Sequence, residues 1–314
     1  MQKNVKFDVI GFGATAVDDL LHVEKYPKPD TKTQIFARER QAGGLTGTAM
    51  VTAARLETQA AYFGALGNDS LSTFTKDEFI QENVDISSVI NMHAARPLHS
   101  TVIIDQSTHE RTIFYSTDHF NPLETKEIPK TLCRNTKFLF MDTFVLPFFP
   151  TLVSIAKKAK TPMLIDVEST DIAQQKEAFD AIEYIFLNKK LAEKMTHKKL
   201  LQKIFDALQS SERICIVITD GKDGCWFQCK NRPVHYLAAF PVNAIDTTGC
   251  GDVFHGAFTA ALIHGKSIQE AVRWGAAAAA MKATQPGGRK GIPSKPELER
   301  FLKHNQNHPV EYHS

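Results

Sequence analysis

The sequence predicts an α/β protein with a mostly parallel central sheet, helices on both faces of that sheet, and a second, small β-sheet. Short apolar strand-like runs alternate with helical segments along almost all of the 314 residues, an order typical of parallel sheets. The strand-like runs are apolar nearly throughout, as strands buried on both faces are. Two β-rich regions interrupt the alternation, and they predict the small sheet.

The elements of the main sheet follow one another along the chain. Apolar runs predict strands, and segments with helical spacing of apolar residues follow most of them. The predicted strands are 7–13, 60–67, 137–144, 162–168, 184–188 and 214–220, and the first predicted helices are 45–56 and 71–81. The sequence contains no internal repeat and no obvious linker, so a single domain over residues 1–314 is expected.

The small sheet is predicted from two regions, about residues 31–41 and 98–117. Residues 33–40 are β-rich where a crossover helix would be expected, and 98–106 and 110–117 flank a polar turn, which is the pattern of a hairpin. Extra edge strands would explain the same pattern. The functional alternative is a lid that closes over a substrate and excludes water.

A helix rich in small residues is predicted near the C-terminus, over residues 268–284. Small side chains allow close packing against another helix, and the helix after Asp252 is the simplest partner.

Composition excludes several classes of protein. Hydrophobic residues make up 43% of the chain, enough for a sizeable core. The 37 lysines and arginines against 35 aspartates and glutamates give a formal net charge of +2, which provides no electrostatic reason for nucleic-acid or membrane binding. No apolar run approaches the ~18–20 residues that span a bilayer, and the N-terminal residues contain no signal-peptide core. A cytoplasmic enzyme is expected.

The five cysteines are scattered along the chain. The five residues at 133, 215, 225, 229 and 250 form no CxxC pair, and their odd number argues against a disulfide framework. Cys225 and Cys229 lie in a strand-like run, where buried thiols are expected rather than a metal site.

The most informative motif is Asp246-Thr-Thr-Gly-Cys-Gly-Asp252, which runs into an apolar helix. A helix N-terminus carries about half a positive charge and unpaired N–H groups. Gly249 and Gly251, on either side of Cys250, let the backbone approach an anion closely. Asp252 would repel a phosphate there unless it takes a proton from the hydroxyl that attacks the phosphate. An acidic N-cap is the structural alternative.

This motif resembles the signature of the PfkB/ribokinase family of sugar and nucleoside kinases, in which an alanine usually stands at the position of Cys250. The resemblance spans about residues 5–305 and implies a ribokinase-like three-layer α/β/α fold with a lid built from the two β-rich regions. It implies that the backbone of Gly249, Cys250 and Gly251 forms the anion hole and that Asp252 is the catalytic base. A thiol at Cys250 makes sensitivity to thiol reagents an expectation.

The resemblance also implies an acceptor site near the N-terminus. Gly13-Ala-Thr-Ala-Val-Asp18 matches a turn that leads to an acid holding sugar hydroxyls, and a carboxylate accepts two such hydrogen bonds. Because Asp19 stands beside Asp18, the match leaves open which of the two acids holds the sugar. The structural alternative for Asp18 is a solvated acid in a loop.

A second acceptor motif resembles the family's first signature. It contains the pair Gly43 and Gly44 and an Ala-rich helix, but Thr48 replaces the usual Asn and Glu57 replaces a final Gly. A threonine hydroxyl offers fewer hydrogen-bond donors than the amide of an asparagine. This difference weakens the expectation that the acceptor is plain ribose. Arg111, on the predicted hairpin, is a candidate contact for an anionic acceptor, with an exposed strand arginine as the alternative.

The nucleotide site is implied by the resemblance as well. Its residues are Asn188, Thr219, Gly221, Gly224, Thr247, Gly249, Gly251, Pro286 and Gly287. Of the family's Asn-x-x-Glu only Asn188 matches, because Leu191 stands at the Glu position; either another acid replaces the Glu, or water and the triphosphate hold the magnesium. ATP and Mg²⁺ are the expected cofactors, and no metal-ligand cluster is predicted. The loop at Pro286 borders a monovalent cation in some members, so K⁺ is left open.

A nicotinamide site is not expected. Gly11-Phe-Gly13-Ala-Thr-Ala16 nearly matches the dinucleotide fingerprint. That motif should open a helix within a βαβ unit, but Lys25-Tyr-Pro27-Lys-Pro29 interrupts any crossover.

The resemblance implies a kinase that transfers the γ-phosphate of ATP to a hydroxyl of a small sugar. Thr48 and the sequence Pro-Gly-Gly-Arg-x-Gly-Ile-Pro at 286–293 look more like the sulfofructose-kinase-like and ketohexokinase-like branch than ribokinase proper, which favours a ketose or a sugar derivative. A nucleoside kinase and a catalytically silent sugar-binding protein remain as alternatives. Pairing of lid strands between two chains makes a homodimer a further expectation.

Overall fold

The computed structural model describes residues 6–108, 110–121 and 123–312. In that part of the chain the main sheet has nine strands, in the order β15-β14-β13-β12-β11-β10-β9-β1-β4. The six from β4 to β12 pair in parallel, and β13, β14 and β15 form an antiparallel edge. Their bounds are β1 Phe7–Phe12, β4 Ala60–Phe63, β9 Thr136–Asp142, β10 Met163–Val167, β11 Tyr184–Asn188, β12 Cys215–Thr219, β13 Cys225–Cys229, β14 Val234–Leu237 and β15 Val310–Tyr312.

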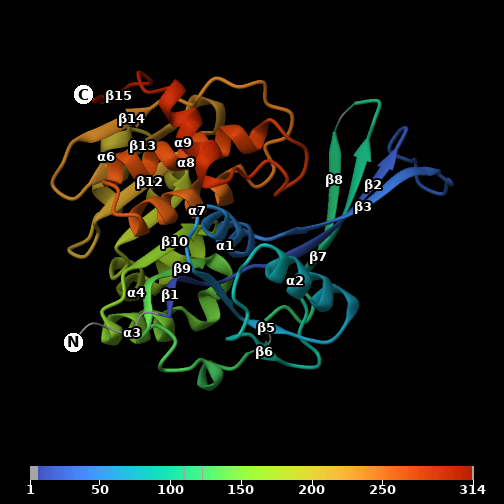
Figure 1. The fold of residues 1–314 in the computed structure, drawn as a ribbon, viewed down its shortest axis with the longest axis horizontal. Helices are drawn as coiled ribbons and strands as arrows, with labels where there is room; N and C mark the ends of the chain where they lie inside the picture. The colour runs from blue at the N-terminus through green and yellow to red at the C-terminus, as the bar shows by residue number, and fades with distance from the viewer. Residues whose placement is uncertain (1–5, 109, 122, 313–314) are drawn as a thin grey trace.

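Helices cover both faces of this sheet and give the predicted three-layer architecture (Figure 1). One face packs against α1 (Leu45–Arg55), α2 (Ser70–Gln81), α7 (Cys250–Ile263), α8 (Ile268–Ala283) and α9 (Lys295–His304). The other packs against α3 (Phe149–Ala159), α4 (Lys176–Asp180), α5 (Lys189–Thr196) and α6 (Leu201–Leu208). Short 3₁₀ turns are η1 Thr125–Glu127, η2 Thr143–Phe148, η3 Thr170–Gln175 and η4 Gly221–Asp223.

A separate four-stranded sheet projects from the body of the molecule (Figure 1). Its order is β3-β2-β7-β8, with β2 Ala16–Val23, β3 Ile35–Gly43, β7 Leu98–Asp105 and β8 Arg111–Ser116. It contains both regions predicted for the small sheet, and β7 and β8 form the predicted hairpin. Strand β2 was not predicted, because its acids break the apolar alternation and its parallel partner β7 lies far along the chain.

Several local expectations need adjustment. The strand predicted over 60–67 is divided into β4 and β5 (Ala65–Leu66), which pairs with β6 (Ile90–Asn91) in a small sheet of its own. The run Gly11–Ala16 leads into strand β2 and opens no helix, so the dinucleotide fingerprint lacks its structural context. Residues 1–5, in the segment checked for a signal peptide, and residue 109, in the hairpin turn, lie outside the described residues.

Close helix packing confirms the expectation for the small-residue helix. A Cβ built on Gly275 of α8 would lie 2.9 Å from Phe254 of α7, so the two helices approach through that glycine. On the other side of α7, a Cβ on Gly256 would lie 2.3 Å from the Ala49 carbonyl oxygen of α1. Cys225 is buried in β13 and Cys229 is half-buried there. Among the described residues, no helix combines the length and apolar character needed to cross a membrane.

Candidate active site

The signature motif forms a loop and the first turn of α7. Gly249 is the N-cap residue, with φ at 75°, and a Cβ there would lie 2.9 Å from the Gly288 carbonyl oxygen. A Cβ on Gly251 would meet nothing closer than the His255 ring at 3.9 Å, so space is open beside this glycine. Because the first N–H groups of a helix have no partner within it, this turn is suited to an anion.

Asp246 and Lys282 hold the loop in place. The Asp246 carboxylate accepts hydrogen bonds from the backbone N–H groups of Thr248 and Gly287, each at 2.8 Å. The fully buried Lys282 donates from Nζ to the Asp246 carbonyl oxygen, also at 2.8 Å. The signature loop is therefore joined to the loop that follows α8.

Cys250, between the two glycines, is turned into the helix layer. Its Sγ donates to the Ala279 carbonyl oxygen of α8 at 3.5 Å, and burial raises the pKa of the thiol. A raised pKa lowers the thiolate fraction, which reduces the expected sensitivity to thiol reagents.

Asp252 lies in the first turn of α7 but makes no N-cap hydrogen bond, because the cap position belongs to Gly249. The acidic-cap interpretation therefore does not apply. Burial and the neighbouring carboxylates of Asp166 and Asp142 raise the pKa of Asp252 well above its usual value, and Arg289 opposes that shift.

Asp142 ends strand β9 and is fully buried. Its carboxylate accepts hydrogen bonds from the N–H of Ala14 at 2.7 Å, the hydroxyl of Thr46 at 2.8 Å and the N–H of Phe144 at 2.8 Å. Burial raises its pKa to about 6. These bonds tie the end of β1 and the start of α1 to β9, so Asp142 has a structural role.

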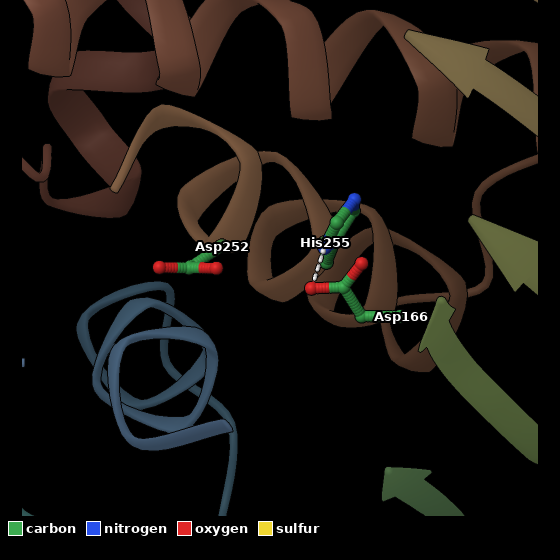
Figure 2. Close-up of side chains that lie close together, drawn as sticks. All are labelled: Asp166, Asp252 and His255. Atoms are coloured by element: carbon green, nitrogen blue, oxygen red, sulfur yellow. Dashed lines mark ion pairs between the residues drawn. The ribbon is translucent and has the colours of Figure 1, made fainter. Parts of the chain in front are cut away.

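Asp166 in β10 has no such set of partners. Its Oδ2 lies 3.3 Å from Nδ1 of His255, on α7, while its Oδ1 and the ring nitrogens of His255 make no hydrogen bond to any described residue. Figure 2 shows the Asp166 carboxylate facing the His255 ring, with Asp252 on the preceding turn of the same helix. One ligand atom from each of the three lies within 4.8 Å of the others. Glu168 lies two residues after Asp166, just past the end of β10. Its side chain is exposed, but partial desolvation and the negative charge of Asp166 raise its pKa to about 7.

A cleft of about 1220 Å³ lies between the small sheet and the signature loop. It brings together five of the predicted site residues, namely Asp18, Arg111, Thr247, Pro286 and Gly287. The guanidinium of Arg111 donates a hydrogen bond to the Thr248 hydroxyl, so β8 reaches across to the signature loop. This contact places the small sheet over the entrance to the α7 turn.

The structure distinguishes the two adjacent acids of β2. Asp18 lines the cleft and accepts a hydrogen bond from the Ser100 hydroxyl, and desolvation raises its pKa. Asp19 lines a hollow on the opposite face, paired with Arg40 at 2.8 Å and His99 at 2.9 Å. Period-two alternation of a strand explains why neighbours differ so strongly.

The glycine pair and Thr48 surround a buried arginine that was not predicted. Arg289 donates from Nη2 to the Gly43 carbonyl oxygen at 2.8 Å and from Nε to the Thr48 hydroxyl at 3.3 Å. Thr48 is only 2% exposed, so its hydroxyl contacts the arginine rather than the cleft. A Cβ on Gly43 would lie 2.8 Å from Oδ2 of Asp18, and Gly44 has φ at 88° as the N-cap of α1.

The remaining predicted nucleotide residues lie at the carboxyl ends of β11 and β12, outside the lining of that cleft. Asn188 and Thr219 are register partners. Asn188 caps α5 by accepting from the N–H of Leu191 at 2.9 Å, and the Leu191 side chain packs into the core. Gly221 has φ at 56° and Gly224 has φ at 89°, where a Cβ would lie 2.2 Å from the Leu237 carbonyl oxygen.

Sequence reasoning missed Asp166, Glu168, Lys282 and Arg289. A signal existed for the two acids, since they end the predicted strand 162–168 and the carboxyl ends of parallel strands are where functional groups gather. Lys282 carried no local signal. Arg289 stands in the motif at 286–293, but the motif does not reveal its partners Gly43 and Thr48, which lie far away in the sequence.

Comparison with known proteins identifies the family. The family model described as pfkB family carbohydrate kinase matches residues 6–295. The chain belongs to the PfkB family of carbohydrate kinases. It is a sugar kinase of this type and an ATP-using enzyme by its family.

Relatives of this PfkB chain have several substrates in their names. A ribokinase from Haemophilus influenzae is 25% identical over 299 residues, covering 93% of this chain and 97% of the relative. A 5-dehydro-2-deoxygluconokinase from Clostridium botulinum is 23% identical over 332 residues, covering 96% and 94%. The solved ribokinase of Thermotoga maritima shares the fold, with a TM-score of 0.81, 24% identity and coverage of 95% and 99%.

Proposed function

We propose that this PfkB protein transfers the γ-phosphate of ATP to a hydroxyl of a small sugar, with a ketose or a sugar derivative favoured over ribose. The observation that carries the proposal is the position of Asp252 in the first turn of α7, beside a glycine loop suited to an anion and under a sheet that reaches across to that loop.

In this proposal Asp252 accepts the proton of the attacking hydroxyl. The backbone N–H groups of Gly249, Cys250 and Gly251, together with the helix dipole, stabilise charge that develops on the transferred phosphoryl group. The small sheet acts as a lid, since it borders the cleft and touches the signature loop through Arg111. Excluding water in this way limits wasteful hydrolysis of ATP.

The acceptor is bound by Asp18, by the backbone at Gly43 and Gly44, and by Arg111. Thr48 contributes through Arg289, which it holds. Arg111 lines the cleft beside Asp18 and Arg289 lies buried behind it, and both favour the ionised form of the Asp18 carboxylate. A polyol that also carries an electronegative or anionic substituent suits such a site, which favours a sugar derivative.

The nucleotide is proposed to lie along Asn188, Thr219, Gly221, Gly224, Thr247, Gly249, Gly251, Pro286 and Gly287. The Mg²⁺ that accompanies ATP would fit near Glu168, an exposed carboxylate of the hard-oxygen type that Mg²⁺ prefers. In this proposal Glu168 replaces the family's magnesium-binding Glu, whose position is occupied by Leu191 in this chain. When bound, Mg²⁺ neutralises charge on the phosphate oxygens.

A homodimer through the lid and a cytoplasmic location stay predictions. The lid carries exposed apolar side chains in Phe36 (54% exposed), Phe114 (55%) and Tyr115 (76%), which supports pairing with a second lid. A role for K⁺ was left open by the resemblance. Because Lys282 already supplies a positive charge to the Asp246 carbonyl oxygen, we propose that the wild-type protein does not require K⁺.

The proposal is tested by measuring ADP release from Mg·ATP in the presence of each member of a panel of possible acceptors. The panel contains pentoses, ketohexoses, their phosphorylated or sulfonated forms, and nucleosides. We expect turnover on one sugar class and a loss of about 10²–10⁴-fold in kcat for Asp252→Asn. Asp18→Asn should raise the KM for the sugar, whereas the matched Asp19→Asn, on the other face of β2, should leave it unchanged.

Other outcomes favour the alternatives. Turnover confined to nucleosides would make the protein a nucleoside kinase. Sugar binding without any ADP release would indicate a silent sugar-binding protein, and failure to bind ATP would contradict the kinase proposal itself.

A further inference from the structure

We propose that Asp166, Asp252 and His255 form a binding site for a divalent first-row transition-metal ion, distinct from the Mg²⁺ that accompanies ATP. Their ligand atoms lie within 4.8 Å of one another. The site is a property of the free protein, so it does not rest on the proposed function.

The fold fixes the three side chains from two directions. Asp252 and His255 are three residues apart on α7, and residues at this spacing share a helix face. Asp166 reaches them from β10, in the middle of the parallel sheet. Figure 2 shows this arrangement, with the Asp166 carboxylate beside the His255 ring and Asp252 one turn earlier on the helix. The His255 ring is held by stacking on Phe186, with ring centroids 4.6 Å apart.

The buried polar atoms of the cluster lack hydrogen-bond partners. Asp166 is 1% exposed and His255 4% exposed, yet Asp166 Oδ1 and both His255 ring nitrogens make no hydrogen bond to any described residue. Buried polar atoms are nearly always hydrogen-bonded, so an unsatisfied carboxylate oxygen next to an imidazole with no hydrogen bond points to a ligand, which one of the two ring nitrogens would bind. A proton on Nδ1 shared with Asp166 Oδ2 would leave both Nε2 and Oδ1 unsatisfied.

Asp142 provides a contrast within the same region. It is equally buried, but its carboxylate accepts four hydrogen bonds, from Ala14, Thr46 (backbone and hydroxyl) and Phe144. The carboxylate of Asp166 therefore stands out by its missing partners and not by its burial alone.

The donor set selects the kind of metal. Two carboxylates and an imidazole suit Mn²⁺, Co²⁺ or Zn²⁺, whereas Mg²⁺ prefers oxygen ligands only and keeps several waters. Two ligand atoms on one ion, at bonds of about 2.1 Å, stand at most roughly 4.2 Å apart. The 3.3 Å between Asp166 Oδ2 and His255 Nδ1 already suits two ligands of one ion, and the widest separation in the cluster needs a contraction of at most about 0.6 Å. Asp252 is partly exposed, which gives the ion a route of entry.

The first test measures Mn²⁺ binding to the whole chain in the absence of nucleotide. Electron paramagnetic resonance reports binding as a loss of the signal of free Mn²⁺. We expect one bound ion per chain that an equal concentration of Mg²⁺ does not displace. Asp166→Asn and His255→Gln should each weaken binding by at least the ~10–100-fold that loss of an outer-shell partner costs. His99→Gln is the matched control, because His99 pairs with Asp19 at 2.9 Å in the lid, away from the cluster, and it should bind Mn²⁺ like wild type.

A measurement on the unaltered protein covers the case in which a variant fails to fold. Pulsed resonance of bound Mn²⁺ should show coupling to a histidine nitrogen. The proposal is overturned by absence of Mn²⁺ binding without nucleotide, by binding that both variants retain, by displacement with equal Mg²⁺, or by absence of the nitrogen coupling. None of these outcomes depends on whether the protein phosphorylates a sugar.

Discussion

Hydrogen-bond accounting separates residues with a structural role from residues that are free to act. The carboxylates of Asp142 and Asp246 both accept hydrogen bonds from backbone N–H groups, and these bonds hold loops together. Asp252 caps no helix and lies among other carboxylates. Because like charges are costly in a partly buried place, such a residue is expected to have a function that compensates its unfavourable position.

At the scale of single residues, we predict the effect of replacing Lys282. Its ammonium lies on the Asp246 carbonyl oxygen, so Lys282→Met leaves this carbonyl without its buried donor. Leaving it unpaired costs about 1–3 kcal/mol, and we expect kcat to fall roughly 10-fold as the signature loop loosens.

Added K⁺ should restore part of the activity of Lys282→Met but leave wild type unaffected, since two cations on one carbonyl repel each other. Lys189→Met is the control, because Lys189 pairs with Asp220 near the surface. Steady-state rates with and without K⁺ decide the matter. A wild-type enzyme that depends on K⁺ would contradict the prediction.

At the scale of elements, close contacts through glycine position α7. Gly256 brings α7 against α1 and Gly275 brings α8 against α7. These contacts set where the N-terminus of α7 lies relative to the carboxyl edge of the sheet. The turn at the start of α7 is therefore placed by packing at Phe254 and Gly256, one to two helical turns further along α7, as well as by its own loop.

Gly256→Ala tests this packing. An alanine in a helix interior gains up to about 1 kcal/mol from propensity, but its Cβ would lie 2.3 Å from a backbone oxygen of α1, which cannot turn aside. We therefore expect a net loss of about 1–3 kcal/mol, typical of overpacking, seen as a lower urea midpoint.

Gly251→Ala is the matched control on the same helix, since a Cβ there meets only His255 at 3.9 Å. Its urea midpoint should not fall, while its kinase activity should, because Gly251 borders the proposed anion hole. A fall in stability for Gly251→Ala as large as that for Gly256→Ala would contradict this account.

At the scale of the whole molecule, the lid is a sheet held away from the main core. It projects beyond the body (Figure 1) and leaves apolar side chains exposed on β3 and β8. An exposed apolar sheet of this kind marks an interaction surface, and a second copy of the lid is the partner we propose.

Phe114→Asp tests the dimer. Phe114 is the register partner of Thr101, which lines the hollow on the face away from the cleft. We expect light scattering after size exclusion to show a dimer for wild type and a monomer for this variant. Leu200→Asp, at a side chain that is 72% exposed at the start of α6, should remain dimeric. Wild type that is monomeric at micromolar concentration would rule the lid dimer out.

The sequence by itself determined the parts that depend on local pattern. Alternating apolar strands and helices predicted the layered sheet, a polar turn between β-rich runs predicted the hairpin of β7 and β8, and Asp246–Asp252 predicted the turn at α7. In each case the residues that carry the signal are neighbours along the chain, so periodicity and backbone freedom are visible in the sequence.

Tertiary structure alone decided which distant residues meet. Arg289 contacts Thr48 across 241 positions. Asp166 meets Asp252 and His255 because β10, in the middle of the sheet, lies beside the first turns of α7. β2 became a lid strand by pairing with β3 and β7, and its alternation set Asp18, not Asp19, in the cleft. Such contacts depend on strand order and helix packing, which no local periodicity encodes.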